Sequence, residues 1–170
     1  MKKLFILILC SLLFTGCSAP TTTPAHTTAP TQTEVITPET APETEPTNPE
    51  IPLNIYLPDE NAENFHTIPT VIYEENANLI VALLIEHSML NEGIALNNIN
   101  LEGNQLNLDF NQAFLDQLRT YGTAGERMMI GCVVNTFLSI YEAETVYITV
   151  NGEIMESGHV IYDFPMEFFE

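Results

Sequence analysis

The sequence predicts an α+β domain in which two or three helices pack on one face of a mixed or antiparallel sheet, preceded by a disordered linker. Short runs of alternating apolar and polar residues indicate strands, and longer apolar runs with helical spacing lie between them. Beyond the apolar N-terminus, both patterns are confined to residues 51–170, which we expect to form a single folded domain.

The beginning of the chain resembles a bacterial lipoprotein signal. A charged start, MKK, precedes an apolar run at residues 4–14 that is too short to span a bilayer as a helix. Small residues then lead to Cys17, as in a lipobox, where the signal is cut before the cysteine and the sulfur is lipidated. We therefore expect a signal peptide at residues 1–16 and a membrane anchor on Cys17. Phe14 stands where leucine is usual, and the alternatives are simple secretion and an uncleaved anchor.

Residues 17–50 predict a disordered linker behind the lipidated cysteine. Thr, Pro, Ala and Glu dominate it, so burial of apolar surface cannot compensate for the entropy of ordering. Fully extended at about 3 Å per residue, such a spacer reaches on the order of 100 Å. It would hold the domain away from the membrane at an extracytoplasmic location.

The chain is strongly acidic, with 23 Asp and Glu against 4 Lys and Arg. Removal of the two lysines with the signal would leave Arg119 and Arg127 against those 23 acidic residues, a net charge of −21. Two cations cannot neutralise a phosphate backbone, which excludes nucleic acid as a partner. The same charge repels anionic lipids and wall polymers.

The domain is expected to open with two strands and a helix. Residues 53–57 alternate, and residues 67–73 form a second β-like run in which Pro69 indicates a sheet edge or a strand start. Residues 76–90 are rich in Leu and Ala, and Gly93 follows them, which favours a helix over a buried strand.

A hairpin and two helices are expected next. Residues 98–102 and 105–110 predict paired strands, and residues 111–120 predict a helix. Thr123 and Glu126 have the spacing of a capping box, in which the two side chains satisfy reciprocal backbone donors, at the start of a helix that reaches about residue 141. Its apolar stripe is expected to cover the sheet and comprises Ile130, Val133, Val134, Phe137 and Tyr141.

The C-terminal part is expected to complete the sheet. Residues 145–150 form the clearest strand, with Val146, Ile148 and Val150 turned inward. Asn151 and Gly152 supply the tight turn of a hairpin. The tail at residues 160–169 is apolar enough to dock on the domain.

These residues together resemble the GerMN domain family of bacterial envelope proteins. The resemblance rests on Asp109-Phe110 at a strand end, on the helix opening at residues 122–126, on Asn135-Thr136-Phe137, and on the strand and turn at residues 146–152. It covers most of residues 51–170. The asparagine-rich segment at residues 91–100 departs from the family, whose members often carry a proline and a glycine there.

The resemblance implies a compact α+β domain found in sporulation and spore germination proteins and in surface lipoproteins. The family is similar to ring-building domains of envelope machines, which implies protein–protein assembly and leaves a homo-oligomer open. The resemblance implies no cofactor, and the family has no catalytic residues that could be assigned to positions of this sequence.

The sequence gives little support for nucleophilic catalysis. It contains no G-x-S-x-G motif, and Ser88 beside His87 on a helix would face another direction. We expect His87 at the edge of the core. Cys132 lies among apolar residues and is expected to be a buried, inert thiol.

Acidic side chains leave two alternatives open. Asp59, Glu60 and Glu63 offer oxygen ligands at close spacing for calcium, although the EF-hand arrangement is lacking. Paired carboxylates would also serve a cell-wall hydrolase if one of them were desolvated in a cleft. The loops that carry these acidic residues are, however, expected to be exposed to solvent. We favour a non-catalytic, lipid-anchored module that binds an envelope protein or a wall ligand.

Overall fold

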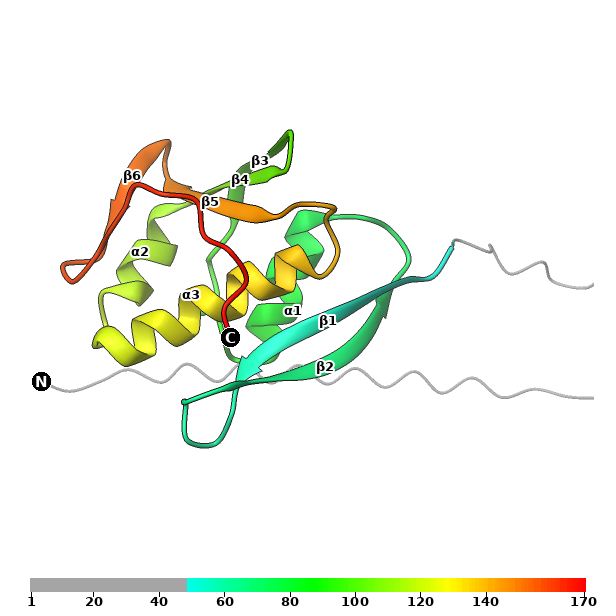
Figure 1. Cartoon of the computed structure of the whole chain (residues 1–170), viewed down its shortest axis with the longest axis horizontal. Coiled ribbons are helices and arrows are strands. Elements are labelled where there is room, and N and C mark those ends of the chain that lie inside the picture. Colours follow the sequence, from blue (N-terminus) through cyan, green and yellow to red (C-terminus); the bar gives the residue numbers. More distant parts are fainter. Residues whose placement is uncertain (1–48) are drawn as a thin grey trace, which may run out of the picture. The chain divides into compact units, whose positions relative to one another are not determined.

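The computed structural model of the protein describes residues 49–170. The expected signal peptide, Cys17 and nearly all of the expected linker lie outside this part. Pairs of strands and helices follow one another along the described chain, which ends with three strands, and Figure 1 labels most of these elements. They are β1 (Ile51–Pro58), β2 (Phe65–Ile72), α1 (Ala77–Glu86), β3 (Leu96–Glu102), β4 (Gln105–Phe110), α2 (Gln112–Leu118), α3 (Thr123–Leu138), β5 (Thr145–Val150), β6 (Glu153–Glu156) and β7 (Ile161–Tyr162).

The α+β class is confirmed, but the strands divide between two sheets where the sequence predicted one. β1 and β2 form an antiparallel pair, and β3 to β7 form a five-stranded sheet in sequence order. β4 and β5 are parallel neighbours, because α2 and α3 lie between them in the chain and carry it back across the sheet. In Figure 1, α1 and α3 lie between the five-stranded sheet and the β1–β2 pair.

The hydroxyl groups of Thr136 in α3 and of Ser139, the C-cap residue of α3, satisfy the edge of β1 that has no neighbouring strand. Thr136 Oγ1 accepts a hydrogen bond of 3.0 Å from the backbone N–H of Tyr56, and Ser139 Oγ accepts one of 3.2 Å from that of Asn54. A helix therefore covers this edge, and the two-stranded sheet extends no further. Pro69 lies on β2, at the other edge of the pair, as predicted; proline has no N–H to offer an additional strand.

The helix α3 is buried on all sides over Met128–Phe137, so the single stripe expected from the sequence understates its burial. It contacts β1 on one side and β5 on another. Gly131 permits the approach of β2, because a Cβ at this position would clash with the Phe65 ring and lie 2.8 Å from its Cε1. The sequence thus places its smallest residue where the Phe65 ring packs against the helix.

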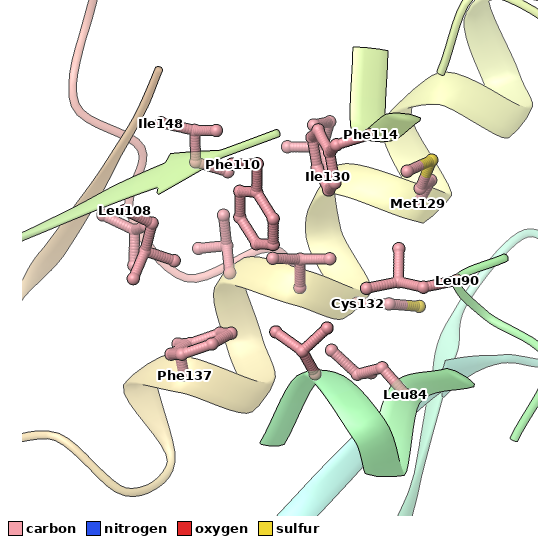
Figure 2. Packing of buried hydrophobic residues seen from close by; sticks show 14 of the residues in the cluster. Leu84, Leu90, Leu108, Phe110, Phe114, Met129, Ile130, Cys132, Phe137 and Ile148 are labelled. Carbon is pink, nitrogen blue, oxygen red and sulfur yellow. The ribbon is translucent and has the colours of Figure 1, made fainter. Parts of the chain in front are cut away.

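The core surrounds α3. Figure 2 shows side chains from the five-stranded sheet, among them Leu108 and Ile148, together with Phe137 and Ile130 of α3 and Leu84 of α1. Each of these side chains is at most 1% exposed. Burial of one such side chain stabilises a protein by about 1.5–3 kcal/mol. The alternating pattern of β4 and β5 is confirmed, since their aliphatic residues and Phe110 all point into this core.

The first helix ends earlier than the sequence predicted. Asn76 caps its start, with Oδ1 accepting a 3.0 Å hydrogen bond from the N–H of Asn78. The helix stops at Glu86, because Ser88 adopts a left-handed conformation with φ of 60° and the chain turns back there. Gly93, expected to follow the helix end, lies in the next loop.

The C-terminal tail docks on the domain, as expected. After β7, Met166 forms an isolated antiparallel bridge with Val146 of β5, with both N···O distances at 2.8 Å. Met166 is 3% exposed and belongs to the core. Within residues 49–170, no helix combines the length and apolarity needed to cross a membrane.

Candidate binding site

The five-stranded sheet turns a polar face away from the helices. Side chains alternate along a strand, so the burial of Leu106, Leu108 and Phe110 directs the other residues of β4 outward, and β5 follows the same rule. The register then aligns outward side chains of β3, β4 and β5 in three rows. We call these residues the polar face; its rows are Asn98, Asp109 and Thr149, then Asn100, Asn107 and Tyr147, then Glu102, Gln105 and Thr145.

A hollow of about 400 Å³ lies over the polar face. Side chains of all three strands line it, including Asn107 and Tyr147 at its middle row and the carboxylates of Glu102 and Asp109 at opposite ends. Its size is within the range of small-molecule sites, about 300–1,000 Å³. The face is therefore large enough for a ligand and carries hydrogen-bonding groups over its whole width.

Asp109 is the most firmly held side chain of the polar face. Its Oδ1 accepts hydrogen bonds of 2.7 Å from the Thr149 hydroxyl and from the backbone N–H of Gly152, and its Oδ2 accepts one of 3.1 Å from Asn97 Nδ2. Partial burial raises the pKa of Asp109, but these three donors outweigh it and hold the pKa below its ordinary value. A fixed carboxylate therefore stands at this end of the face at neutral pH.

The amides of the polar face are linked in pairs that leave groups for a ligand. Asn100 Nδ2 donates to Glu102 Oε1 and Gln105 Nε2 donates to Asn107 Oδ1, each at 2.7 Å. These bonds orient the amides, while the Nδ2 group of Asn107 and the Oδ1 atom of Asn100 have no hydrogen-bond partner within residues 49–170. The face thus presents oriented donors and acceptors side by side.

Asn151 and Gly152 lie beside Asp109 and form the two-residue turn between β5 and β6. Both have positive φ, 53° and 78°, which is the conformation that a type I′ hairpin turn requires. Asn151 Oδ1 also accepts a hydrogen bond from Asn97 Nδ2 at 3.3 Å. The turn therefore supports one end of the polar face as well as closing the hairpin.

The capping box expected at Thr123 and Glu126 does not form. Gly122 occupies the N-cap position of α3 without a capping side chain, and Glu126 is 1% exposed. Its carboxylate turns inward, where Oε1 accepts a 2.7 Å hydrogen bond from the Tyr162 hydroxyl and Oε2 lies 3.0 Å from Nδ1 of His159. Partners from the distant β7 region thus compete successfully with the local backbone for this carboxylate.

Sequence reasoning missed how Asn135 holds the tail. Asn135 is fully buried in α3; its Nδ2 donates to the Phe169 carbonyl and its Oδ1 accepts from the Phe169 N–H, both at 2.8 Å. The guanidinium group of Arg127 lies over the rings of Phe65 and Phe169, with its Cζ 5.9 Å and 5.7 Å from their centroids. A polar residue within the apolar run of a helix was the available signal, because a buried amide needs partners.

The three carboxylates considered for calcium are not gathered into one group of ligands. Asp59 Oδ1 accepts from the backbone N–H groups of Asn61 and Glu63 at 3.2 Å and 2.9 Å, and Oδ2 accepts from Asn64 Nδ2 at 3.1 Å. The backbone bond from Glu63 is the main cause of the lowered pKa of Asp59. Across residues 49–170, no group of three His, Cys, Asp or Glu side chains is placed to hold a metal ion. Asp59 instead closes its own loop.

Cys132 and His87 lie where the sequence predicted. Cys132 is fully buried, and burial raises the pKa of its thiol to about 12, so the thiolate is not available at neutral pH. His87 is half-buried at the end of α1 and borders a hollow of about 390 Å³ together with His66 and Ser88. Among the described residues, no hydrogen bond joins these three side chains into a nucleophile and base.

Comparison with known proteins agrees with the fold. The family model described as "Germane: Sporulation and spore germination" matches residues 54–156. No curated protein matches the chain. Solved structures that resemble it include the tandem GerMN domains of the sporulation protein GerM from Bacillus subtilis, at 16% identity and a TM-score of 0.51.

That alignment covers 76% of this chain and 48% of the tandem structure, so the chain spans about half of that protein fragment. The first GerMN domain of the same Bacillus subtilis protein matches at 15% identity and a TM-score of 0.46, with 69% of this chain and 96% of that chain covered. At these identities the likeness concerns the fold.

Proposed function

The chain belongs to the Germane family of sporulation and spore germination proteins, and on that premise we propose that it is a non-catalytic, lipid-anchored module that binds an envelope partner outside the cytoplasm. The polar face is the observation that carries the binding role. Helices cover one side of the five-stranded sheet and leave the other side open, where a hollow of about 400 Å³ is lined by oriented polar side chains.

The anchor is proposed from the start of the sequence. A cysteine after an apolar run and small residues is what lipoprotein processing requires, and Cys17 is separated from β1 by the Thr- and Pro-rich residues 18–50. A spacer of that composition gives the domain reach without a fixed orientation. The polar face could then meet a ligand at a distance from the bilayer.

The anchor is tested by Cys17→Ser in cells of the source organism. We expect the wild-type protein in the membrane fraction and the variant in soluble or unprocessed form. Mass spectrometry of the wild-type N-terminus should find a lipidated Cys17. Unchanged fractionation together with an unmodified cysteine would contradict the anchor.

A role in sporulation or germination is tested with the gene itself. We expect deletion, and separately Cys17→Ser, to reduce spore yield or the rate of germination. Normal spores and normal germination after deletion would contradict this part of the proposal.

The purified full-length protein should release no fragments from peptidoglycan. Release that depends on one of its carboxylates would identify a hydrolase instead.

A further inference from the structure

We propose that the polar face binds an uncharged, N-acetylated oligosaccharide; this inference rests on the proposed function and names the chemical class of the ligand. A glycan of this kind has hydroxyl groups that both donate and accept, and acetamido groups that pair with side-chain amides. The polar face combines amides, hydroxyls, two carboxylates and one aromatic ring within a single hollow.

Tyr147 supplies the apolar element of the site. It lies in the middle row, where the register pairs it with Asn107 of β4, and it lines the hollow while remaining half-buried. A tyrosine ring offers a broad apolar surface with a polar tip. The C–H face of a sugar ring can pack on that surface while the sugar hydroxyls reach the neighbouring amides.

The hydrogen-bonding groups of the face match a sugar better than an anionic ligand. Asp109 and Glu102 only accept hydrogen bonds when ionised, so a ligand can hydrogen-bond to either of them only through donors. Asn107 Nδ2 offers a donor group, and Asn100 Oδ1 offers an acceptor. No described residue uses either of them. Sugar hydroxyls and an acetamido group satisfy these requirements together.

Charge excludes anionic ligands from the face. Arg119 and Arg127 are the only cationic Lys or Arg side chains of residues 49–170, and neither lines the hollow. Arg119 donates to the Glu156 carbonyl at 2.7 Å and Arg127 to the Glu170 carbonyl at 2.9 Å. Phosphate or carboxylate groups would therefore meet Asp109 and Glu102 with no cation to offset the repulsion.

A second copy of this chain is also a poor occupant. Two polar faces packed about a two-fold axis would bring acidic side chains of both copies into one interface, where like charges oppose association. Asp109 is moreover held by three donors and cannot turn aside without losing them. Its fixed position suits a ligand that fits a preformed surface.

The test measures binding of chitotetraose, an uncharged oligosaccharide of N-acetylglucosamine, to the full-length protein in detergent by calorimetry. We expect saturable binding that is at least tenfold weaker in Tyr147→Ala and in Asn107→Ala. The control Tyr73→Ala removes an exposed tyrosine outside the polar face and should bind as the wild type does. Maltotetraose, which lacks acetamido groups, should bind at least tenfold more weakly.

Melting temperatures of all variants show whether they fold. Absence of saturable binding by the wild type, equal binding of the two sugars, or equal binding by folded Tyr147→Ala would overturn the assignment. The sugar assignment can fail without the proposed function. An envelope protein captured through the polar face, without chitotetraose binding, would overturn the sugar assignment and leave the binding module standing.

Discussion

The side chain of Asn135 holds the backbone of Phe169 through two hydrogen bonds of 2.8 Å, one donated and one accepted. The bond pattern is that of two paired strands, but a buried helical amide takes the place of one strand. The C-terminal tail is thereby fixed to α3, on the opposite side of the five-stranded sheet from the polar face. The tail leaves the polar face of the sheet uncovered, because it packs against α3.

Asn135→Ala should lower the free energy of unfolding by about 2 kcal/mol, since two hydrogen bonds to a buried side chain are lost. Urea denaturation measures this change, and hydrogen exchange should show a faster-exchanging Phe169 amide. The control Asn78→Ala, at an exposed position of α1, should change stability by less than about 0.5 kcal/mol. Equal stability of the two variants would show that the tail contact is weak.

Gly131→Ala should destabilise the protein by about 1–3 kcal/mol, because the added methyl group overlaps the Phe65 ring. The smaller side chain in Phe65→Leu should relieve this conflict. A double-mutant cycle measured by denaturation should therefore give a coupling energy of at least about 0.5 kcal/mol in favour of the double variant. Strictly additive effects would mean that α3 and β2 do not meet at this point.

Tyr162→Phe should cost about 1–3 kcal/mol, because it removes the 2.7 Å hydrogen bond to Glu126 and leaves a buried carboxylate short of one donor. Burial of Tyr162, followed by its bond to Glu126, raises the pKa of the phenol, so the donor stays protonated throughout the neutral range. Glu126→Gln in the Tyr162→Phe background should recover part of the loss. If Glu126→Gln recovers none of the lost stability, the loss in Tyr162→Phe comes from altered packing and not from the charge of Glu126.

Acid should weaken the protein in part through Asp109. Although partial burial raises its pKa, bonds from Gly152, Thr149 and Asn97 hold that pKa below the ordinary value. A lowered pKa stabilises the folded state above the unfolded-state pKa of about 3.9, and the contribution is lost as pH falls through the folded-state value. The stability difference between wild type and Asp109→Asn should therefore be largest at pH 7 and shrink below about pH 4. A difference that stays constant from pH 7 to pH 3 would contradict this role.

The strands of this protein could be predicted from the sequence because alternation is a local signal. In β4 and β5 each aliphatic residue faces the core, and Asn151-Gly152 can close a two-residue turn whatever surrounds it. The same alternation implied the outward polar residues. Their assembly into one face depends on the parallel pairing of β4 and β5, which no local pattern specifies.

The two sheets and the surroundings of α3 could not be predicted, because they depend on contacts between distant residues. Thr136 and Tyr56 are far apart in the chain, yet their hydrogen bond helps to end the β1–β2 sheet. Glu126 matched a capping box by spacing, but Tyr162 and His159 bind its carboxylate. Where a side chain has several available hydrogen-bond partners, the tertiary fold determines which of them it binds.

If an envelope ligand binds the polar face, photo-crosslinking in living cells should capture it there. A benzophenone amino acid replaces Thr145, a residue of the polar face that does not line the hollow, in one strain and Asn78 on the surface of α1 in another. We expect crosslinked envelope material from the Thr145 position and none from the Asn78 position. Crosslinks from the Asn78 position alone, or none from the Thr145 position in cells that contain the folded protein, would contradict binding at the polar face.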